Sequence, residues 1–505
     1  MAAFLVLLAI SLAAQIPPPA GAGDDPAAAI REQVDSAAHA ESTSLESIAS
    51  RLDKAGQGTE AKVIRGLIEA PVADGAIQFA PLGELVPARP AGPPKLPEEV
   101  ASIRRKAAKM LLDVAKRAGG PEVRAYSLAD QLLRSALARD PENLEVRRVL
   151  GFVPFEGGWA RPEAVALKKR GLVLDPTFGW VEAAWVPHLA KGELPAPGSR
   201  NRWLPAAEVD AQHDRWDDAW QLKTAPHFEV RANVPLAEAV AFGRRLESLQ
   251  ELFTSLFADV IGPDRLPLAK RLANPAAKPE APAKKHQVWY FARKQEYVDY
   301  LIPRQGPNVG ESLGIYFPPR RAAQRNEPAR SYFYRNADAR IDDVSTLAHE
   351  VSHQLLFELA GTARNEDNVG QYWVWEGLGT YFETLQIRPD GTIEVGGKVG
   401  PRFADARDRC LAGGQFLPTA QLAAMGESAF NAEAVIHRNY SEAMAFAVFL
   451  MNGKSGAYRR DFLEYVEDCY RGRFKRGGPA PSLHKRLGGE PAALDAEFLA
   501  FLREA

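Results

Sequence analysis

The pattern of apolar and polar positions changes from helical to strand-like in the middle of the chain. Four short runs rich in aromatic and β-branched residues are typical of strands. They are HFEVRAN (227–233), QVWYFA (287–292), GIYF (314–317) and SYFYR (331–335). From residue 342 onward nearly every segment repeats its apolar residues at the helical period. Strands followed by helices predict the α+β class, with a small mixed sheet preceding a mainly helical region.

The N-terminal part of the chain also has a helical pattern. One apolar helix face is marked by Leu128, Leu132, Leu133 and Leu137. A break before a second helix is predicted over 140–143, so the run from 125 to 159 looks like a tetratricopeptide-type helical pair. Since no second copy follows at a fixed period, a small helical subdomain is favoured over an extended solenoid.

The first fourteen residues, MAAFLVLLAISLAA, are apolar apart from one serine. This run is shorter than the about 20 residues that a membrane span needs, and it is typical of the apolar region of a secretory signal. Small residues at 20–22 suit a cleavage site. A frayed helix or an uncleaved anchor is the alternative interpretation. We therefore expect export to the periplasm or the cell exterior, with no stable membrane span after signal removal.

Proline-rich connectors predict how the chain is divided. Many prolines lie between residues 70 and 98, and an Ala/Pro/Lys-rich loop covers 272–285. The expected organisation is a signal peptide (1–22), a helical segment with a Pro-rich linker (23–98), a helical repeat-like domain (99–205) and a domain with the mixed sheet and later helices (206–505).

Charge and cysteine content narrow the classes of function. The chain has 62 basic and 64 acidic side chains, for a net charge of −2, so no global positive field favours nucleic acid as a partner. Two cysteines cannot build a disulfide-rich scaffold or a four-cysteine zinc site. Cys410 and Cys469 form either one disulfide or, as we favour, two buried free thiols.

Two of the nine histidines lie four residues apart around a glutamate. His349-Glu350-Val351-Ser352-His353 is an H-E-x-x-H motif within DDVSTLAHEVSHQLLFELAG, whose pattern predicts one helix. Residues i and i+4 share a helix face, so both imidazoles can reach one Zn²⁺ ion. Glu350 then lies beside the metal and can take a proton from water as general base. The alternative is a helix with two structural or exposed histidines.

A third ligand is predicted downstream of this helix. Catalytic zinc sites commonly use three protein ligands and leave one position for water. WVWEGLGTYFE (373–383) also has a helical pattern and places Glu376 within reach of an antiparallel return. Glu383, two turns later on the same face, is a candidate to hydrogen-bond a ligating histidine. Exposed helix carboxylates are the alternative for both residues.

The combination HEVSH and WVWEGLGTYFE resembles the gluzincin metallopeptidases, particularly the aminopeptidase N and leukotriene-A4 hydrolase group. The resemblance implies a zincin catalytic domain in which His349, His353 and Glu376 bind zinc, Glu350 is the general base and Glu383 supports a ligand.

In the same group a stretch similar to NYSEAMAFAVFL presents a tyrosine to the metal site. The resemblance implies that Tyr440 donates its hydroxyl to the oxyanion of the intermediate. A buried tyrosine with a satisfied hydroxyl is the alternative. His437, one turn earlier, is a further candidate, although an exposed histidine is the simpler interpretation.

Two departures separate the chain from an ordinary aminopeptidase. The Gly-x-Met-Glu-Asn element, which binds a substrate's free amine in that group, is absent, and the interval from His353 to Glu376 is longer. Over about 125–500 the order of segments is closer to an uncharacterised gluzincin-like family abundant in planctomycete bacteria.

We therefore expect an exported zinc-dependent peptidase that acts on a peptide or protein, with SYFYR (331–335) pairing with extended substrate. The alternative function is a non-catalytic envelope binding or assembly protein that uses the helical N-terminal region. The substrate specificity and the oligomeric state do not follow from the sequence.

Overall fold

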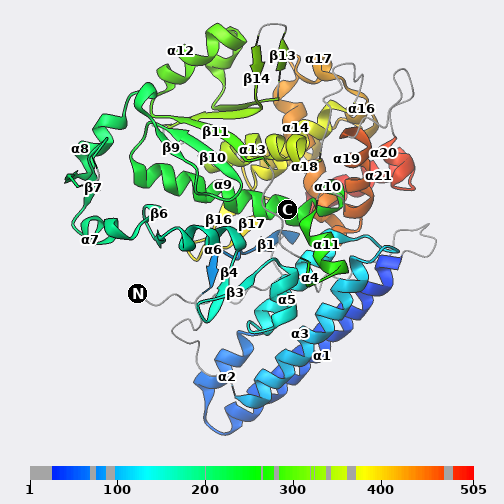
Figure 1. Cartoon of the computed structure of the whole chain (residues 1–505). Helices are drawn as coiled ribbons and strands as arrows, with labels where there is room; N and C mark the ends of the chain where they lie inside the picture. Colours follow the sequence, from blue (N-terminus) through cyan, green and yellow to red (C-terminus); the bar gives the residue numbers. More distant parts are fainter. Residues whose placement is uncertain are drawn as a thin grey trace. The chain divides into compact units, whose positions relative to one another are not determined.

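Most helices and strands of the chain are described by a computed structural model, in which the predicted α+β class is confirmed (Figure 1). The described residues are 26–68, 75–86, 97–199, 201–262, 266–277, 284–318, 320–322, 325–336, 343–360, 371–470 and 482–504. They divide into two compact units. The first unit holds Met1–Trp159, Thr254–Pro279 and Leu359–Ala505, and the second holds Ala160–Phe253 and Glu280–Glu358. The predicted signal peptide (1–22) lies outside the described residues.

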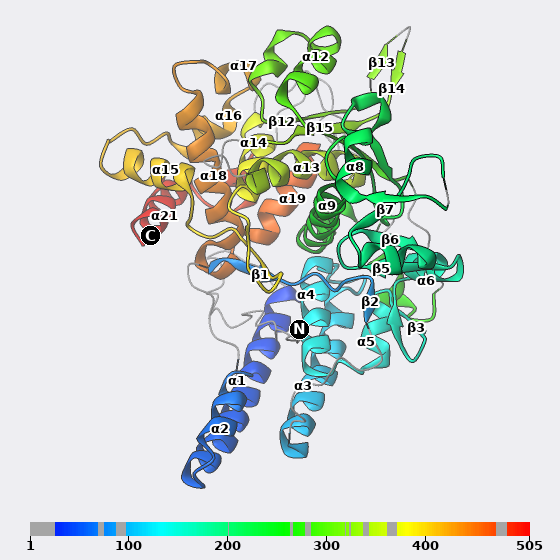
Figure 2. The same cartoon turned by 90° about the vertical axis from the view of Figure 1, so that its left-hand side faces the viewer.

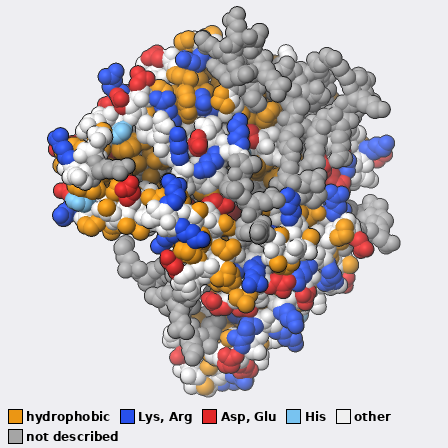
Figure 3. Space-filling view, in the orientation of Figure 1, with side chains coloured by type: hydrophobic (Ala, Val, Ile, Leu, Met, Phe, Trp, Pro, Cys, Tyr) orange, Lys and Arg blue, Asp and Glu red, His pale blue; other side chains and the backbone are white. Residues whose placement is uncertain are grey.

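The N-terminal helices of the first unit pack along one another, as Figures 1 and 2 show. They are α1 (Pro26–Lys54), α2 (Gly58–Arg65), α3 (Glu98–Ala118), α4 (Tyr126–Arg139) and α5 (Leu144–Val149). On the face drawn in Figure 3, basic and acidic side chains are interspersed over these helices. Exposed ion pairs between these helices, such as Arg51–Glu99 at 2.6 Å, contribute little stability each.

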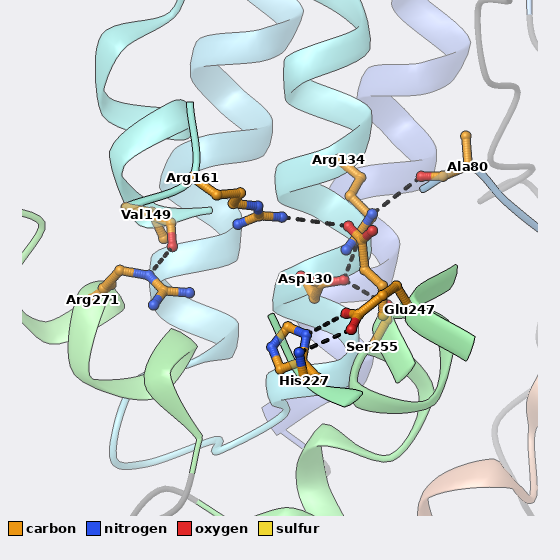
Figure 4. A network of polar contacts seen from close by, with 10 residues as sticks. Ala80, Asp130, Arg134, Val149, Arg161, His227, Glu247, Ser255 and Arg271 are labelled. Atoms are coloured by element: carbon orange, nitrogen blue, oxygen red, sulfur yellow. Dashed lines mark hydrogen bonds and ion pairs between the residues drawn. The ribbon is translucent and has the colours of Figure 1, made fainter. Parts of the chain in front are cut away.

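Helix α4 is held by buried polar contacts (Figure 4). Asp130 accepts hydrogen bonds from Arg134, at 2.6 Å, and from Ser255, at 2.5 Å. Arg134 also donates to the carbonyl of Ala80 at 3.2 Å. Asp259 accepts from the backbone N–H groups of Tyr126 and Ser127, which begin the helix. These contacts satisfy buried groups that would otherwise lose free energy on leaving water.

The C-terminal part of the first unit packs around one buried helix. Helix α18 (Ile436–Asn452) contacts α14 (Tyr372–Phe382) and α15 (Pro401–Leu411), and α19 (Arg459–Tyr470) follows it. The predicted break near Gly453 is confirmed. Gly377 of α14 lies so close to α18 that a Cβ atom there would be 3.1 Å from the Ala443 carbonyl oxygen. A glycine therefore allows the two helices to approach closely.

The second unit contains a five-stranded mixed sheet in the order β12-β15-β11-β10-β9. The strands are β9 (Trp220–Leu222), β10 (Phe228–Ala232), β11 (His286–Phe291), β12 (Gly314–Phe317) and β15 (Arg330–Tyr334). The three inner strands are parallel, and β9 and β12 pair antiparallel at the two edges. The four strands expected from the sequence are thereby confirmed.

Side-chain alternation assigns helices to the two faces of this sheet. Tyr290 of β11 stacks on Phe242 of α9 (Leu236–Leu256), and Ser331 of β15 donates to Gln354 of α13 (Asp343–Ala360). On the opposite face, Phe291 contacts Tyr297 of α12 (Lys294–Gln305). Helices α9 and α13 therefore cover one face and α12 covers the other, because successive side chains of a strand point to opposite faces.

The expected helical character of 99–205 extends only as far as α5, apart from short helices. Small hairpins follow, built from β3 (Val153–Phe155), β4 (Gly158–Ala160), β5 (Leu172–Asp175), β6 (Gly179–Glu182), β7 (Glu193–Pro195) and β8 (Trp203–Pro205). Turns containing glycines in the left-handed region, such as Gly157 (φ 76°), separate these strands. The domain boundaries predicted at 98 and 205 stay predictions.

In the part of the chain that the structure describes, the helices are too short or too polar for any of them to cross a bilayer.

Candidate metal centre

The H-E-x-x-H motif lies on helix α13, as the sequence predicts. Leu347, Val351 and Leu355 recur every four residues and are almost completely buried. This apolar face fixes the rotation of the helix, since burying it is favourable. Helix α13 begins at Asp343, the second of the two aspartates at the start of the predicted run. Asp342 and Gly361, the first and last residues of that run, lie outside the described residues.

The two histidines present their nitrogens to one point. Nε2 of His349 and Nε2 of His353 are 3.1 Å apart, and the two rings are nearly perpendicular. Two nitrogens bound at 2.0–2.1 Å to one tetrahedral zinc ion would lie roughly 3.3 Å apart. The observed separation therefore fits shared metal ligation as well as a hydrogen bond between neutral rings.

Glu376 is the third residue that lies close to the two histidine nitrogens. One ligand atom from each of His349, His353 and Glu376 lies within 4.8 Å of the others, so the three residues form a group that could hold a metal ion. His353 and Glu376 are buried, and His349 is half-buried. Two imidazoles and one carboxylate are the donor set of zinc sites that keep an open position, so the residues fit the metal that the sequence predicts.

The Glu376 carboxylate is held from within its own helix. The hydroxyl of Tyr372, one turn earlier, donates to Oε1 of Glu376 at 2.9 Å. Burial raises the pKa of Tyr372 above its ordinary value, and the Glu376 carboxylate adds to the rise, while a hydrogen bond from Asn431 opposes it. The phenol therefore remains a donor at neutral pH. The Thr380 hydroxyl donates to the backbone carbonyl of Glu376 at 2.8 Å, which stabilises the helix turn that follows Glu376.

The candidate base, Glu350, contacts the sheet. Its Oε2 atom accepts a hydrogen bond from the backbone N–H of Tyr316 at 2.9 Å. Tyr316 lies on β12, which is an edge strand among the described strands of this sheet. A strand residue directs its N–H and C=O to the same side, so these Tyr316 groups face away from β15.

The expectation that SYFYR pairs with substrate is wrong. These residues form β15, which pairs with β12 on one side and with β11 on the other. Both of its edges are therefore already used, and no backbone groups remain for an added strand. The edge strands of this sheet, among the described residues, are β9 and β12, and β12 is the GIYF run.

Glu383 and Tyr440 share a neighbour that the sequence analysis missed. Arg402 of α15 donates to Oε2 of Glu383 at 2.7 Å, and its guanidinium lies 5.4 Å from the centre of the Tyr440 ring. The predicted hydrogen bond from Glu383 to a ligating histidine stays a prediction. His437, near the start of α18, is exposed, and its catalytic role stays a prediction too.

An aromatic chain connects Tyr440 with the ligand helix. The ring of Tyr440 lies 5.2 Å from that of Phe430, which in turn lies 5.4 Å from that of Tyr372. Because Tyr372 reaches Glu376, the chain leads from α18 to the candidate ligand. The i, i+4 spacing of Tyr372 and Glu376 was visible in the sequence, whereas nothing in the sequence marked Arg402 or the Tyr316 amide.

Both cysteines are free and buried, which confirms the favoured interpretation. Burial raises the pKa of Cys410 to about 12, with a further contribution from Glu442. Glu442 of α18 is itself buried, which raises its pKa to about 7, and it accepts a hydrogen bond from the backbone N–H of Leu417 at 3.2 Å.

A comparison with known protein families finds a match that covers these residues. Residues 343–468 match the family described as "Protein of unknown function (DUF1570)". The match begins at α13 and ends within α19, so it contains the three candidate ligands as well as Glu350 and Tyr440. No curated protein matches the chain.

Proposed function

We propose that the chain is an exported zinc-dependent peptidase of the gluzincin type. The observation that carries the proposal is the convergence of His349, His353 and Glu376, with Glu350 on the same helix turn as the histidines. The sequence resemblance to gluzincins supports the same assignment, and the apolar leader supports export.

A zinc ion bound by these ligands would lower the pKa of the attacking water and polarise the peptide carbonyl. Glu350 takes the proton from that water and later delivers it to the leaving amine. The Tyr316 N–H holds Oε2 of Glu350, which keeps the carboxylate oriented for both transfers.

Tyr440 donates its hydroxyl to the oxyanion that forms on the substrate carbonyl. The contacts of its ring with Arg402 and with the tilted ring of Phe430 restrict the position of that ring. An extended substrate adds to the edge of β12, where the backbone carbonyl of Tyr316 faces away from the sheet and the Tyr316 N–H is bound to Glu350.

Zinc content and hydrolysis together test the proposal. We expect one zinc per chain in the full-length protein, lost in His349→Ala and kept in His39→Ala, which changes an exposed histidine of α1. Glu350→Gln should keep the zinc and lose hydrolysis of an unfolded protein by about 10²- to 10⁴-fold. The exposed Glu433→Gln variant is the control.

Two outcomes would contradict the proposal. If Glu350→Gln hydrolyses the substrate as fast as the wild type, Glu350 is not the general base. Zinc binding without cleavage of any member of a broad peptide library would instead favour the non-catalytic binding or assembly function.

A further inference from the structure

Three polar side chains on one face of α13 reach the sheet. Glu350, Gln354 and Glu358 are spaced by four residues, so they share a helix face and lie about 6 Å apart along the axis. Glu350 contacts β12, Gln354 contacts β15 and β11, and Glu358 contacts β11. The row therefore follows the order of the strands in the sheet. Neighbouring strands are about 4.8 Å apart, so one step of four residues along the helix corresponds roughly to one strand.

Gln354 is the middle member of this row, and both ends of its amide are hydrogen-bonded. It is completely buried, and its Oε1 accepts from the Ser331 hydroxyl at 2.8 Å. Its Nε2 donates to the backbone carbonyl of Gln287 at 3.2 Å and to Oε1 of Glu358 at 3.0 Å. Glu358 is held in turn by His286 of β11, whose Nδ1 lies 2.7 Å from the second oxygen, Oε2. Because a buried amide loses free energy when it lacks partners, these contacts hold α13 against two strands.

The Ser331 contact lies beside the contact of the candidate base. Ser331 is the partner of Tyr316 in the antiparallel pair of β15 and β12, and the Tyr316 N–H donates to Glu350 at 2.9 Å. One turn along the helix therefore corresponds to one strand inward in the sheet. A movement of α13 that breaks the contact between Gln354 and Ser331 also moves Glu350 relative to the sheet.

We infer that Gln354 is a positioning residue, which holds α13 where the Tyr316 N–H reaches the Glu350 carboxylate. Its part in catalysis rests on the proposed function, because it assumes that Glu350 is the general base. Gln354 is completely buried and acts only through Glu350. Since a displacement of about 1 Å can lower a rate by about 100-fold, such a residue affects the reaction without touching the substrate.

Hydrogen exchange of the full-length protein tests the position of Glu350 without any hydrolysis. The Tyr316 N–H faces away from β15, so its protection depends on Glu350, whereas the N–H of Ile315 points toward β15. Gln354→Met keeps the length of the side chain and removes its hydrogen bonds. We expect the Tyr316 N–H of this variant to exchange about 10-fold faster than in the wild type, and that of Ile315 to change by less than about twofold.

Asn233→Leu is the matched control. Asn233 is a buried amide of the same unit, 2% exposed. None of its side-chain hydrogen bonds reaches α13, and its partners are Asp214, Ala292 and Glu296. A general loss of stability should therefore appear in both variants, and faster exchange of the Tyr316 N–H relative to its neighbours only in Gln354→Met.

Kinetics connects this position with the reaction. Gln354→Met should lower kcat about 10-fold and leave KM and zinc content within about twofold of the wild type, because an effect on the base acts on the transition state. The same substitution should lower kcat about 10-fold in Tyr316→Ala, which keeps the backbone N–H, and less than about twofold in Tyr316→Pro, which lacks it. A merely structural role would lower kcat equally in both backgrounds.

Ser331→Ala covers the case in which Gln354→Met does not fold, because it removes only the hydroxyl that donates to Gln354. We expect about threefold faster exchange of the Tyr316 N–H in this variant. Unchanged exchange in Gln354→Met, or in Ser331→Ala if the first variant does not fold, would overturn the inference. Equal losses of kcat in the two Tyr316 backgrounds would also overturn it.

The proposed function fails separately from this inference. A wild type that binds no zinc or cleaves no peptide would overturn the proposed function and the catalytic part of the inference. The exchange of the Tyr316 N–H would still decide whether Gln354 positions Glu350, since that measurement needs neither zinc nor substrate.

Discussion

The backbone N–H of Tyr316 donates a 2.9 Å hydrogen bond to Oε2 of Glu350. The donor belongs to an edge strand and the acceptor to the motif helix, so the sheet contributes directly to the orientation of the candidate base. Hydrogen bonds to charged groups contribute about 1.5–3 kcal/mol, which is enough to decide the position of a carboxylate.

Removing this N–H should slow hydrolysis. Tyr316→Pro removes both the donor and the ring, whereas Tyr316→Ala removes the ring and keeps the donor. Proline is tolerated on edge strands where the N–H points away from the sheet. We expect kcat of Tyr316→Pro to be roughly 10-fold or more below that of Tyr316→Ala, with the zinc content equal in both. Equal kcat values would show that the amide does not orient Glu350.

Tyr440→Phe should lower kcat by about 10²- to 10³-fold without changing zinc affinity, because it removes one donor to the oxyanion. Steady-state kinetics on the best peptide from a library would measure the change. Tyr458→Phe is a suitable control, since the Tyr458 hydroxyl pairs with Glu497 instead. If kcat of Tyr440→Phe equals that of the wild type, the Tyr440 hydroxyl takes no part in catalysis and the residue contributes only to packing.

The buried carboxyl of Glu442 should make the stability of the protein depend on pH. Its pKa is raised from 4.5 to about 7, mainly by burial, so the folded state binds a proton that the unfolded state releases. Stability therefore falls as the pH rises from about 4.5 to 7, and the cost is complete above pH 7. The difference in pKa corresponds to about 3 kcal/mol.

Glu442→Gln removes this titration and keeps an oxygen for the Leu417 N–H. We expect the variant to raise the midpoint of thermal unfolding more at pH 8 than at pH 5, in chelator-treated protein. Glu433→Gln, at an exposed position, should show no such difference. An equal effect of Glu442→Gln at both pH values would contradict the assignment.

The two cysteines should be inaccessible in the native protein. Cys410 and Cys469 are 6% and 7% exposed, and burial raises the pKa of both thiols, which disfavours the reactive thiolate. A thiol reagent should react with neither in native protein and with two per chain in denaturant without reductant. No reaction in denaturant would indicate a disulfide instead.

Local patterns in the sequence predicted several elements that the structure confirms. The helix around His349 and His353, the helix that carries Glu376 and the four strands all follow from periodicity. The same local rule, that residues four apart share a helix face, explains why the two imidazoles meet. The same rule places Tyr372 next to Glu376 on α14, although nothing else in the sequence drew attention to Tyr372.

The order of the strands in the sheet could not be predicted from the sequence. The aromatic composition of SYFYR suggests a strand that could pair with substrate, but β15 lies between β11 and β12. Short strands of similar composition do not reveal which of them lies at an edge, because this depends on pairing between distant segments. The hairpins after α5 were missed because the positions of their turns depend on backbone conformations such as that of Gly157.

The sequence by itself determined the α+β class, the spacing of the two histidines and the carboxylates available to join them, because helical geometry relates residues only a few positions apart. The tertiary structure alone decided that the Tyr316 amide meets Glu350, that Arg402 meets Glu383, and that β12 lies at the edge. These contacts arise when apolar faces bury against one another and bring together side chains that are far apart along the chain.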